Sequence, residues 1–358
     1  MADLSRRASV DAQVLDEIVA GRQTKVSTAA LARVARELGV EPTELWSNSQ
    51  PDDARLSVRF RNAGIPDFFA ADEPTLRNAI NKAMQVRALN ESLGLTPPLG
   101  DSWFPAEAVG AIPYEDGYRK ARQVRNGLHV KGFLTDADEP LGDISTIVEE
   151  AFGIPVLEDN FRAGSVLALT VKIAELGAAA VVVNGDGAYG LTEQRRRVDV
   201  SHELAHALFD SPSKSLGLWI DETTDVESEG AADRVEQRAR AFAAELLLPI
   251  QGLRHLLGTP PSRHPTVQAA VDLALRARAH FGTTSEITIN HLANHGYMPK
   301  HMRDAVKEQM PPAPTARPVA RRRLLERRVR EAVARGLMTQ MRARELLSLS
   351  AWDTLAES

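Results

Sequence analysis

Two short apolar runs in the middle of the chain most constrain its fold. They occupy residues 165–173 (SVLALTVKI) and 178–186 (AAAVVVNGD), and the second ends in residues that interrupt strands. A third strand signal lies in residues 144–159 (ISTIVEEAFGIPVLED). Helical spacing of apolar residues dominates before and after these runs, so the pattern predicts a mixed α+β fold.

Size and composition narrow the class of protein. A chain of 358 residues exceeds what one hydrophobic core usually supports, so two or three domains are expected. A net charge of -5 favours neither nucleic acid nor an acidic membrane as a partner of the whole chain. The chain has no cysteine, which excludes disulfides, thiolate metal sites and a cysteine nucleophile. The N-terminus lacks a signal peptide, and the longest apolar run, 178–183, cannot span a bilayer, so we expect a soluble cytoplasmic protein with no membrane partner.

Residues 202–206 form the motif His-Glu-x-x-His inside the apolar segment VDVSHELAHALFD. The i,i+4 spacing puts His202 and His206 on one helix face, where two ring nitrogens can reach one zinc ion at about 2.0–2.1 Å. Glu203 lies beside them and can take a proton from metal-activated water and pass it to a leaving amine. The alternative is a helix with two partly buried histidines that bond to their neighbours.

A third ligand would favour the metal site over that alternative. Glu236 stands at the start of a second helical pattern, EQRARAFAAELLLP, thirty residues after His206. Two histidines and one glutamate leave the fourth position of zinc open for water, as hydrolysis requires. The alternative for Glu236 is a solvated carboxylate at a helix end.

These segments resemble the ImmA/IrrE family of zinc metallopeptidases. AAAVVVNGDGAYGLTEQRRRVDVSHELAHALFD is similar to the family's strand, Arg-rich approach and active-site helix, and EQRARAFAAELLLP to its second helix. The resemblance implies a zincin-like core that holds one Zn²⁺ per chain through His202, His206 and Glu236, with Glu203 as general base and acid. It also implies an endopeptidase with a narrow protein substrate, often an Xre-type repressor or antitoxin, in a stress or mobile-element response.

One position departs from the family pattern. Arg240 stands where the family commonly has Asn or Asp, four residues after the glutamate ligand. An arginine donates hydrogen bonds where a metal-binding imidazole N–H needs an acceptor. Asp199, Asp210 and Asp233 are the candidate replacements, and the sequence does not rank them.

The N-terminal residues predict a helical module. LSRRASVDAQVLDEIVAG and STAALARVARELGVEPTELW resemble helices two to five of an Xre/Cro-type helix-turn-helix domain that lacks its first helix. Gln13, Arg22 and Lys25 are the candidate nucleic-acid contacts. Residues 1–50 hold six Lys or Arg and seven Asp or Glu, a poor balance for phosphate contact. A helical module that serves dimerisation or the docking of a protein therefore remains an open alternative to DNA binding. A homodimer is also among the expected partners.

Further histidines, arginines and tyrosines have side chains that suit a functional site. His291 and His295 are also spaced i,i+4, but no acidic residue follows His291, so a structural or surface pair is favoured over a second metal site. Residues 195–197, all arginine, can hold substrate or face solvent. Tyr189, Tyr297 or one of these arginines can stabilise an oxyanion, and nothing in the sequence selects among them.

The full prediction is an α+β, zincin-like metallopeptidase core with an all-α helix-turn-helix-like N-terminal domain and a helical C-terminal extension. The alternative function is a DNA-binding regulator, or antitoxin-like protein, that uses the metallopeptidase fold as a sensor or interaction surface. The C-terminal extension includes a basic stretch, 317–336, in which eight arginines and two glutamates give a net charge of +6. The predicted domains are 1–50 (helix-turn-helix), 51–115 (helical connector), 116–310 (metallopeptidase) and 311–358 (basic helical tail).

Overall fold

The computed structural model describes most of the chain from residue 72 onwards. The described residues are 5, 6, 8, 10–19, 30, 32–34, 37, 72–100, 109–161, 166–173, 177–185, 192–210, 216–222, 231–312, 323–347 and 349. The chain divides into two compact units, residues 1–62 with 344–354, and residues 63–343 with 355–358.

The larger unit contains a four-stranded mixed sheet and most of the helices. The strand order is β1-β3-β2-β4; β1 pairs with β3 in parallel, and the other two pairs are antiparallel. The strands are β1 (Val156–Asp159), β2 (Val166–Ile173), β3 (Ala178–Asn184) and β4 (Leu216–Glu222). The helices are α5 (Glu73–Leu93), α6 (Pro113–Val130), α7 (Ile144–Phe152), α8 (Glu193–Phe209), α9 (Ala231–Leu247), α10 (Ile250–Leu257), α11 (Val267–Phe281), α12 (Ser285–Asn294), α13 (Arg303–Gln309) and α14 (Arg323–Ala334). A 3-10 turn lies at Lys300–Met302. Helix α15 (Gln340–Leu347) begins in the larger unit and ends in the smaller one.

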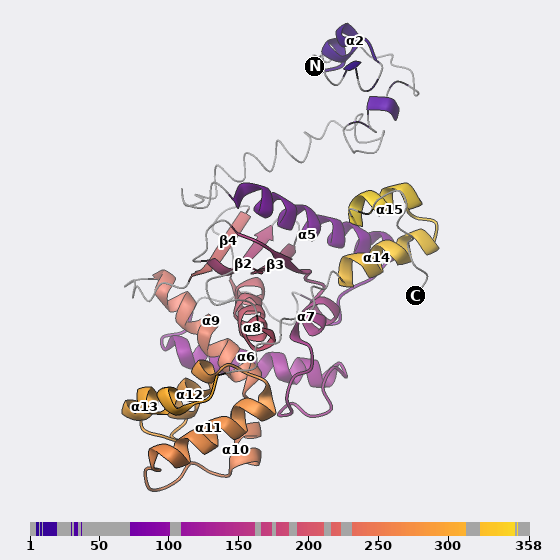
Figure 1. Ribbon diagram of the computed structural model, residues 1–358. Helices are drawn as coiled ribbons and strands as arrows, with labels where there is room; N and C mark the ends of the chain where they lie inside the picture. Colours follow the sequence, from indigo (N-terminus) through magenta and orange to yellow (C-terminus); the bar gives the residue numbers. More distant parts are fainter. Residues whose placement is uncertain are drawn as a thin grey trace. The chain divides into compact units, whose positions relative to one another are not determined.

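Helices cover both faces of the central strands. Helix α5 lies across one face of β2 and β3, and α8 lies against the other (Figure 1). Strands buried on both faces are expected to be apolar at nearly every position rather than at every second one. This explains the continuous apolar runs in the sequence of β2 and β3, where only Lys172 in β2 and Ala179 in β3 are partly exposed.

The sequence prediction of strands at 166–173 and 178–184 is confirmed, but residues 144–152 form helix α7 instead of a strand. Asp143 caps this helix by accepting a hydrogen bond from the backbone N–H of Ser145 at 3.1 Å, and Gly153 ends it in the left-handed conformation. The buried positions Ile144, Ile147, Val148 and Ala151 repeat at helical spacing, and this outweighs their β-branched character.

A glycine lets α6 pack closely along α9. A side chain on Gly117 of α6 would meet the backbone of Arg238 and lie 2.8 Å from the Cβ of Ala241, so only glycine permits this approach. Helix α9 also packs against α8 and α12 and thus joins the sheet layer to the C-terminal helices. The position of α9 decides where its two buried or half-buried carboxylates, Glu236 and Glu245, lie.

The predicted connector, and the predicted tail up to residue 343, are packed parts of the larger unit where the structure describes them. Helix α5 buries Leu76, Ile80 and Leu89, and α14 packs against α5 and α7. The functional division into domains stays a prediction. Among the described helices, none is both long enough and apolar enough to cross a membrane.

The smaller unit holds helix α2 (Ala12–Val19) and a small apolar cluster of Ala8, Val10, Leu15 and Val34. Gln13, a candidate nucleic-acid contact, is exposed on α2. The other two candidates, Arg22 and Lys25, lie outside the described residues. The helix-turn-helix prediction therefore remains a prediction.

Candidate metal centre

Helix α8 places the His-Glu-x-x-His motif in the interior. Thr192 caps the helix by accepting a hydrogen bond from the backbone N–H of Arg195 at 3.2 Å, and the helix then runs between the sheet and α9. His202, Glu203 and His206 are buried, with exposures of 3%, 0% and 1%. Burial on a helix fixes these side chains before any ligand binds.

Glu236 on α9 reaches the two histidines, and we call His202, His206 and Glu236 the first cluster. The Nε2 atoms of His202 and His206 lie 3.1 Å apart, and Glu236 Oε2 lies 3.1 Å from His202 Nε2. Glu236 Oε1 lies 3.5 Å from His206 Nε2. Ligand atoms at tetrahedral angles, about 2.0–2.1 Å from one zinc ion, lie about 3.3–3.4 Å apart. The donor set therefore fits a tetrahedral metal ion with one open position.

Asp210 orients His206. Its Oδ2 accepts a hydrogen bond from His206 Nδ1 at 2.7 Å, which leaves the Nε2 lone pair directed at the cluster, while Oδ1 pairs with the buried Arg238. Of the three predicted replacements, Asp210 is thus the one that contacts a cluster histidine. Asp199 pairs with Arg195 at 2.8 Å, and the side chain of Asp233 lies outside the described ones.

Arg240 acts on the first cluster through its charge. It is exposed on α9, so it does not replace the missing acceptor. Burial by itself raises the pKa of Glu236, but the hydrogen bond to His202 and the charges of His202, His206 and Arg240 outweigh burial and lower this pKa to about 2. Glu236 is therefore an ionised carboxylate at neutral pH, as a metal ligand must be.

Thr170 on β2 holds Glu203. Its Oγ1 lies 2.6 Å from Glu203 Oε2 and 2.9 Å from the backbone oxygen of Glu203, and both residues are fully buried. This contact is not among the sequence predictions. The available signal was a threonine among the apolar residues of a buried strand, since a buried hydroxyl needs a partner.

Two more neighbours were missed. The ring of Trp219 on β4 stacks on that of His206, with 6.0 Å between centroids and 14° between planes. Lys172 on β2 donates from Nζ to the backbone oxygens of Ala207 at 2.7 Å and Asp210 at 3.0 Å, so it closes the C-terminal end of α8. Neither contact can be predicted from the sequence, because both residues lie about ten or more positions from the motif, on strands that meet α8 through tertiary packing.

Two of the three arginines before the motif stabilise the fold. Arg197 donates to the backbone oxygens of Gly142, Leu141 and Phe281, and Arg196 donates to Ser145 Oγ at 3.2 Å. Both are buried, so the two predicted alternatives, substrate contact or a solvent-facing side chain, are wrong for them.

The oxyanion candidates receive no support from the described residues. Tyr297 is buried and donates to the backbone oxygen of Gly258 at 2.7 Å, which commits its hydroxyl to a turn. Tyr189 lies outside the described residues.

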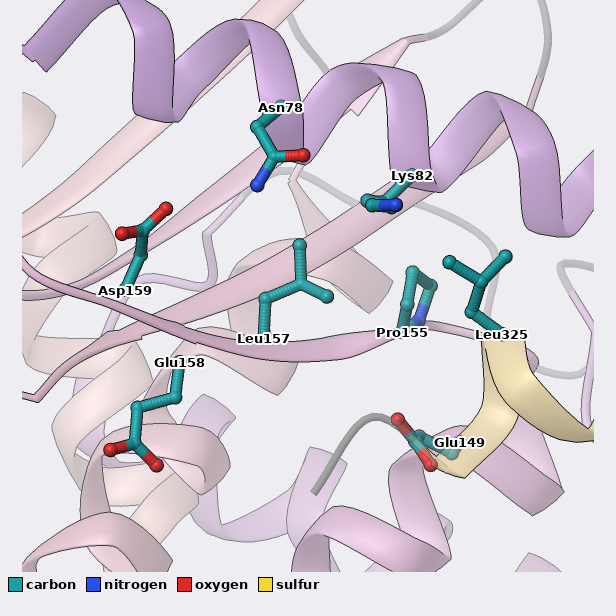
Figure 2. Close-up of a pocket in the computed structure, with 8 residues that line it drawn as sticks. All are labelled: Asn78, Lys82, Glu149, Pro155, Leu157, Glu158, Asp159 and Leu325. Carbon is teal, nitrogen blue, oxygen red and sulfur yellow. The ribbon is translucent and has the colours of Figure 1, made fainter. Parts of the chain in front are cut away.

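The structure also has a pocket that is separate from the first cluster. It lies beside α5, β1 and the start of α14 and includes none of the first-cluster residues (Figure 2). Glu149 at this pocket is committed to the fold, because its carboxylate accepts the backbone N–H of Val156 at 3.3 Å and of Leu324 at 3.0 Å. Burial raises the pKa of Glu149 to about 7 despite these two bonds. The pocket is lined by Asn78, Lys82, Glu149, Pro155, Leu157, Glu158, Asp159 and Leu325.

Comparison with known proteins adds one finding. Residues 149–288 match the family model of peptidase M78, described as the IrrE N-terminal-like domain. This segment contains all three first-cluster residues and Glu203. No curated protein matches the chain. The match supports the resemblance to the ImmA/IrrE family, and with it a metallopeptidase-type function for this part of the chain.

Proposed function

We propose that this protein is a zinc-dependent endopeptidase that uses Glu203 as general base and acid. The observation that carries the proposal is the convergence of two histidine Nε2 atoms and a carboxylate within about hydrogen-bond distance of one another, on two helices that the family model matches. His202, His206 and Glu236 would hold the ion. Zinc bound there would supply Lewis acidity, which polarises a peptide carbonyl and makes water a better nucleophile.

The residues around the metal site would have separate roles. Glu203 would take a proton from the attacking water and deliver it to the leaving nitrogen, so that its carboxylate ends the cycle as it began. Thr170 would hold one carboxylate oxygen of Glu203, and Asp210 would hold the ring of His206. These contacts keep the reacting groups in place before substrate arrives, which lowers the reorganisation that catalysis requires.

Access to the first cluster is on the side of Glu236. The side chain of Glu236 is 26% exposed, whereas those of His202 and His206 are 4% and 1% exposed. A peptide would therefore approach past this carboxylate. We propose an Xre-type repressor or antitoxin as the substrate, on the basis of the family resemblance.

The substitution Glu203→Gln tests this function. It keeps the size of the side chain and removes its proton transfer, so we expect zinc to stay bound while cleavage of a co-expressed repressor falls by roughly 10²–10⁴-fold. Zinc content and product masses are the measurements. Glu193→Gln, at the start of the same helix, is the matched control and should leave both unchanged.

Two results would contradict the proposal. One is a Glu203→Gln protein that cleaves as fast as the wild type. The other is a wild-type protein that binds no zinc at the first cluster when zinc is supplied; specific DNA binding by such a protein would favour the regulator instead.

A further inference from the structure

A second carboxylate–histidine cluster lies on another side of α9. It consists of Glu245 on α9, His291 on α12 and His295 directly after α12, and we call it the second cluster. One ligand atom from each residue lies within 4.8 Å of the other two. His291 and His295 lie beyond residues 149–288, so the family match does not cover them.

The geometry of α9 separates the two clusters. Glu245 follows Glu236 by nine residues, which is about two and a half turns and a rise of about 13.5 Å. Half a turn beyond two full turns puts the two carboxylates on opposite sides of the helix. The second cluster is therefore a separate site and cannot form a two-metal centre with the first.

One oxygen of Glu245 is directed at both histidines. Its Oε2 lies 3.3 Å from His291 Nε2 and 3.8 Å from His295 Nε2. The other oxygen, Oε1, accepts the backbone N–H of Ile250 at 3.4 Å and lies 3.4 Å from Arg122 Nη1. The carboxylate is thus held through Oε1, and Oε2 remains for a ligand.

Burial of the second cluster without a ligand costs free energy. Glu245 Oε2, His291 Nε2 and His295 Nε2 are buried atoms that have no hydrogen-bond partner among the described residues. Buried polar atoms in native proteins nearly always have a hydrogen-bond partner. Glu245 Oε2 lies within ion-pair distance of both histidines, but neither contact is a hydrogen bond, so these three atoms need an explanation. The side chains of Glu245 and His291 are fully buried, and that of His295 is 18% exposed.

We propose that the second cluster binds a divalent transition-metal ion, with zinc as the expected ion. One ion would satisfy all three orphan atoms, and imidazole with carboxylate is a donor set that zinc accepts. Water would complete the four ligands from the partly exposed side of His295. The ion would join α9 to the end of α12 and so would stabilise the C-terminal helices on the core.

The surroundings predict a weaker site than the first cluster. His206 has Asp210 as acceptor for its second ring nitrogen, whereas His291 Nδ1 has no partner among the described residues. Loss of such an acceptor typically costs 10–100-fold in metal affinity. The charge of Arg122 beside Glu245 also opposes a cation, although this arginine is half exposed and its effect is screened by solvent.

The test uses the full-length double variant His202→Ala/His206→Ala, which removes the first cluster. After incubation with zinc chloride and gel filtration, we expect one zinc per chain, and we expect added zinc to raise Tm because it binds the folded state. Adding His291→Gln and His295→Gln should abolish both effects. Adding His255→Gln and His264→Gln, two exposed histidines, is the matched control and should abolish neither.

The outcomes separate this proposal from the proposed function. A folded His202→Ala/His206→Ala protein that binds no zinc would overturn the second site, whatever the peptidase does. Zinc that persists after all four histidines are replaced would also overturn it. If the four-histidine variant fails to fold, the zinc titration of the double variant still decides, because that arm leaves the second cluster intact.

Discussion

The two clusters on α9 have the same donor types but different neighbours. The first belongs to His-Glu-Leu-Ala-His, and Glu203 follows its first histidine; the second belongs to His-Leu-Ala-Asn-His, and Leu292 stands at that place. The first has a 26% exposed carboxylate, and the second a fully buried one. If both clusters bind zinc as proposed, the comparison teaches that access and a neighbouring carboxylate base, rather than the donor types, would suit the first cluster to hydrolysis and leave the second to join helices.

Glu149 is a buried carboxylate outside both clusters, and it gives the largest expected effect on stability. The pKa of Glu149 in the folded protein, about 7, lies above its ordinary value of 4.5. The folded protein therefore keeps a proton that the unfolded chain has released, and the free energy of unfolding falls as pH rises from about 4.5 to 7. Integrated over this window, the loss is about 3 kcal/mol.

Glu149→Gln removes this titration. The free energy of unfolding of the variant minus that of the wild type should rise by about 3 kcal/mol between pH 4.5 and 8, as urea unfolding at several pH values would measure. Glu150→Gln, the exposed neighbour that pairs with Arg327, is the control and should give a nearly constant difference. A constant difference for Glu149→Gln would mean that burial does not hold its proton.

Asp210→Ala sharpens the comparison at the first cluster. Without its acceptor, the ring of His206 resembles that of His291, so zinc affinity at the first cluster should fall by about 10–100-fold while the second cluster is unchanged. Competition with a chromophoric chelator measures both. Asp199→Ala, a buried aspartate of α8 that pairs with Arg195, is the matched control. Equal weakening by the two substitutions would show a general loss of packing instead.

Thr170→Val gives the smallest effect. Valine keeps the shape and removes the hydroxyl that lies 2.6 Å from Glu203 Oε2, at a cost of about 1 kcal/mol. We expect kcat to fall by about 5-fold with zinc content unchanged. Thr170→Ser should restore most of the rate because it returns the hydroxyl. A fall for both variants alike would assign Thr170 to strand packing alone.

Local patterns predicted much of the fold. The apolar runs of β2 and β3 follow from the requirement that buried faces be apolar. The same rule failed at residues 144–152, because a short run of β-branched residues satisfies both periodicities and only the caps at Asp143 and Gly153 distinguish them. The strand β4 carried no comparable signal, since LGLWIDE mixes apolar and acidic residues.

The sequence could predict the residues of the first cluster, but not the neighbouring residues that hold them in place. Spacing i,i+4 is a property of one helix, so His202 and His206 could be paired from sequence, and Glu236 came from a family pattern. Asp210 was one of three equal candidates until the structure brought it within 2.7 Å of His206. The sequence shows Thr170 as a polar residue in an apolar run but does not identify Glu203 as its partner, because strand β2 and helix α8 meet only through tertiary packing.

The sequence by itself determined the mixed α+β class, the motif on α8 and the chemistry of its donors, because these depend on residue type and on the period of a single element. Only the tertiary structure decided that Glu236 and Glu245 of one helix serve different histidine pairs. That outcome depends on how α9 packs against α8 and α12. Gly117 on α6 permits the close approach of α6 to α9. Such packing joins elements far apart in the chain, so no local sequence pattern predicts it.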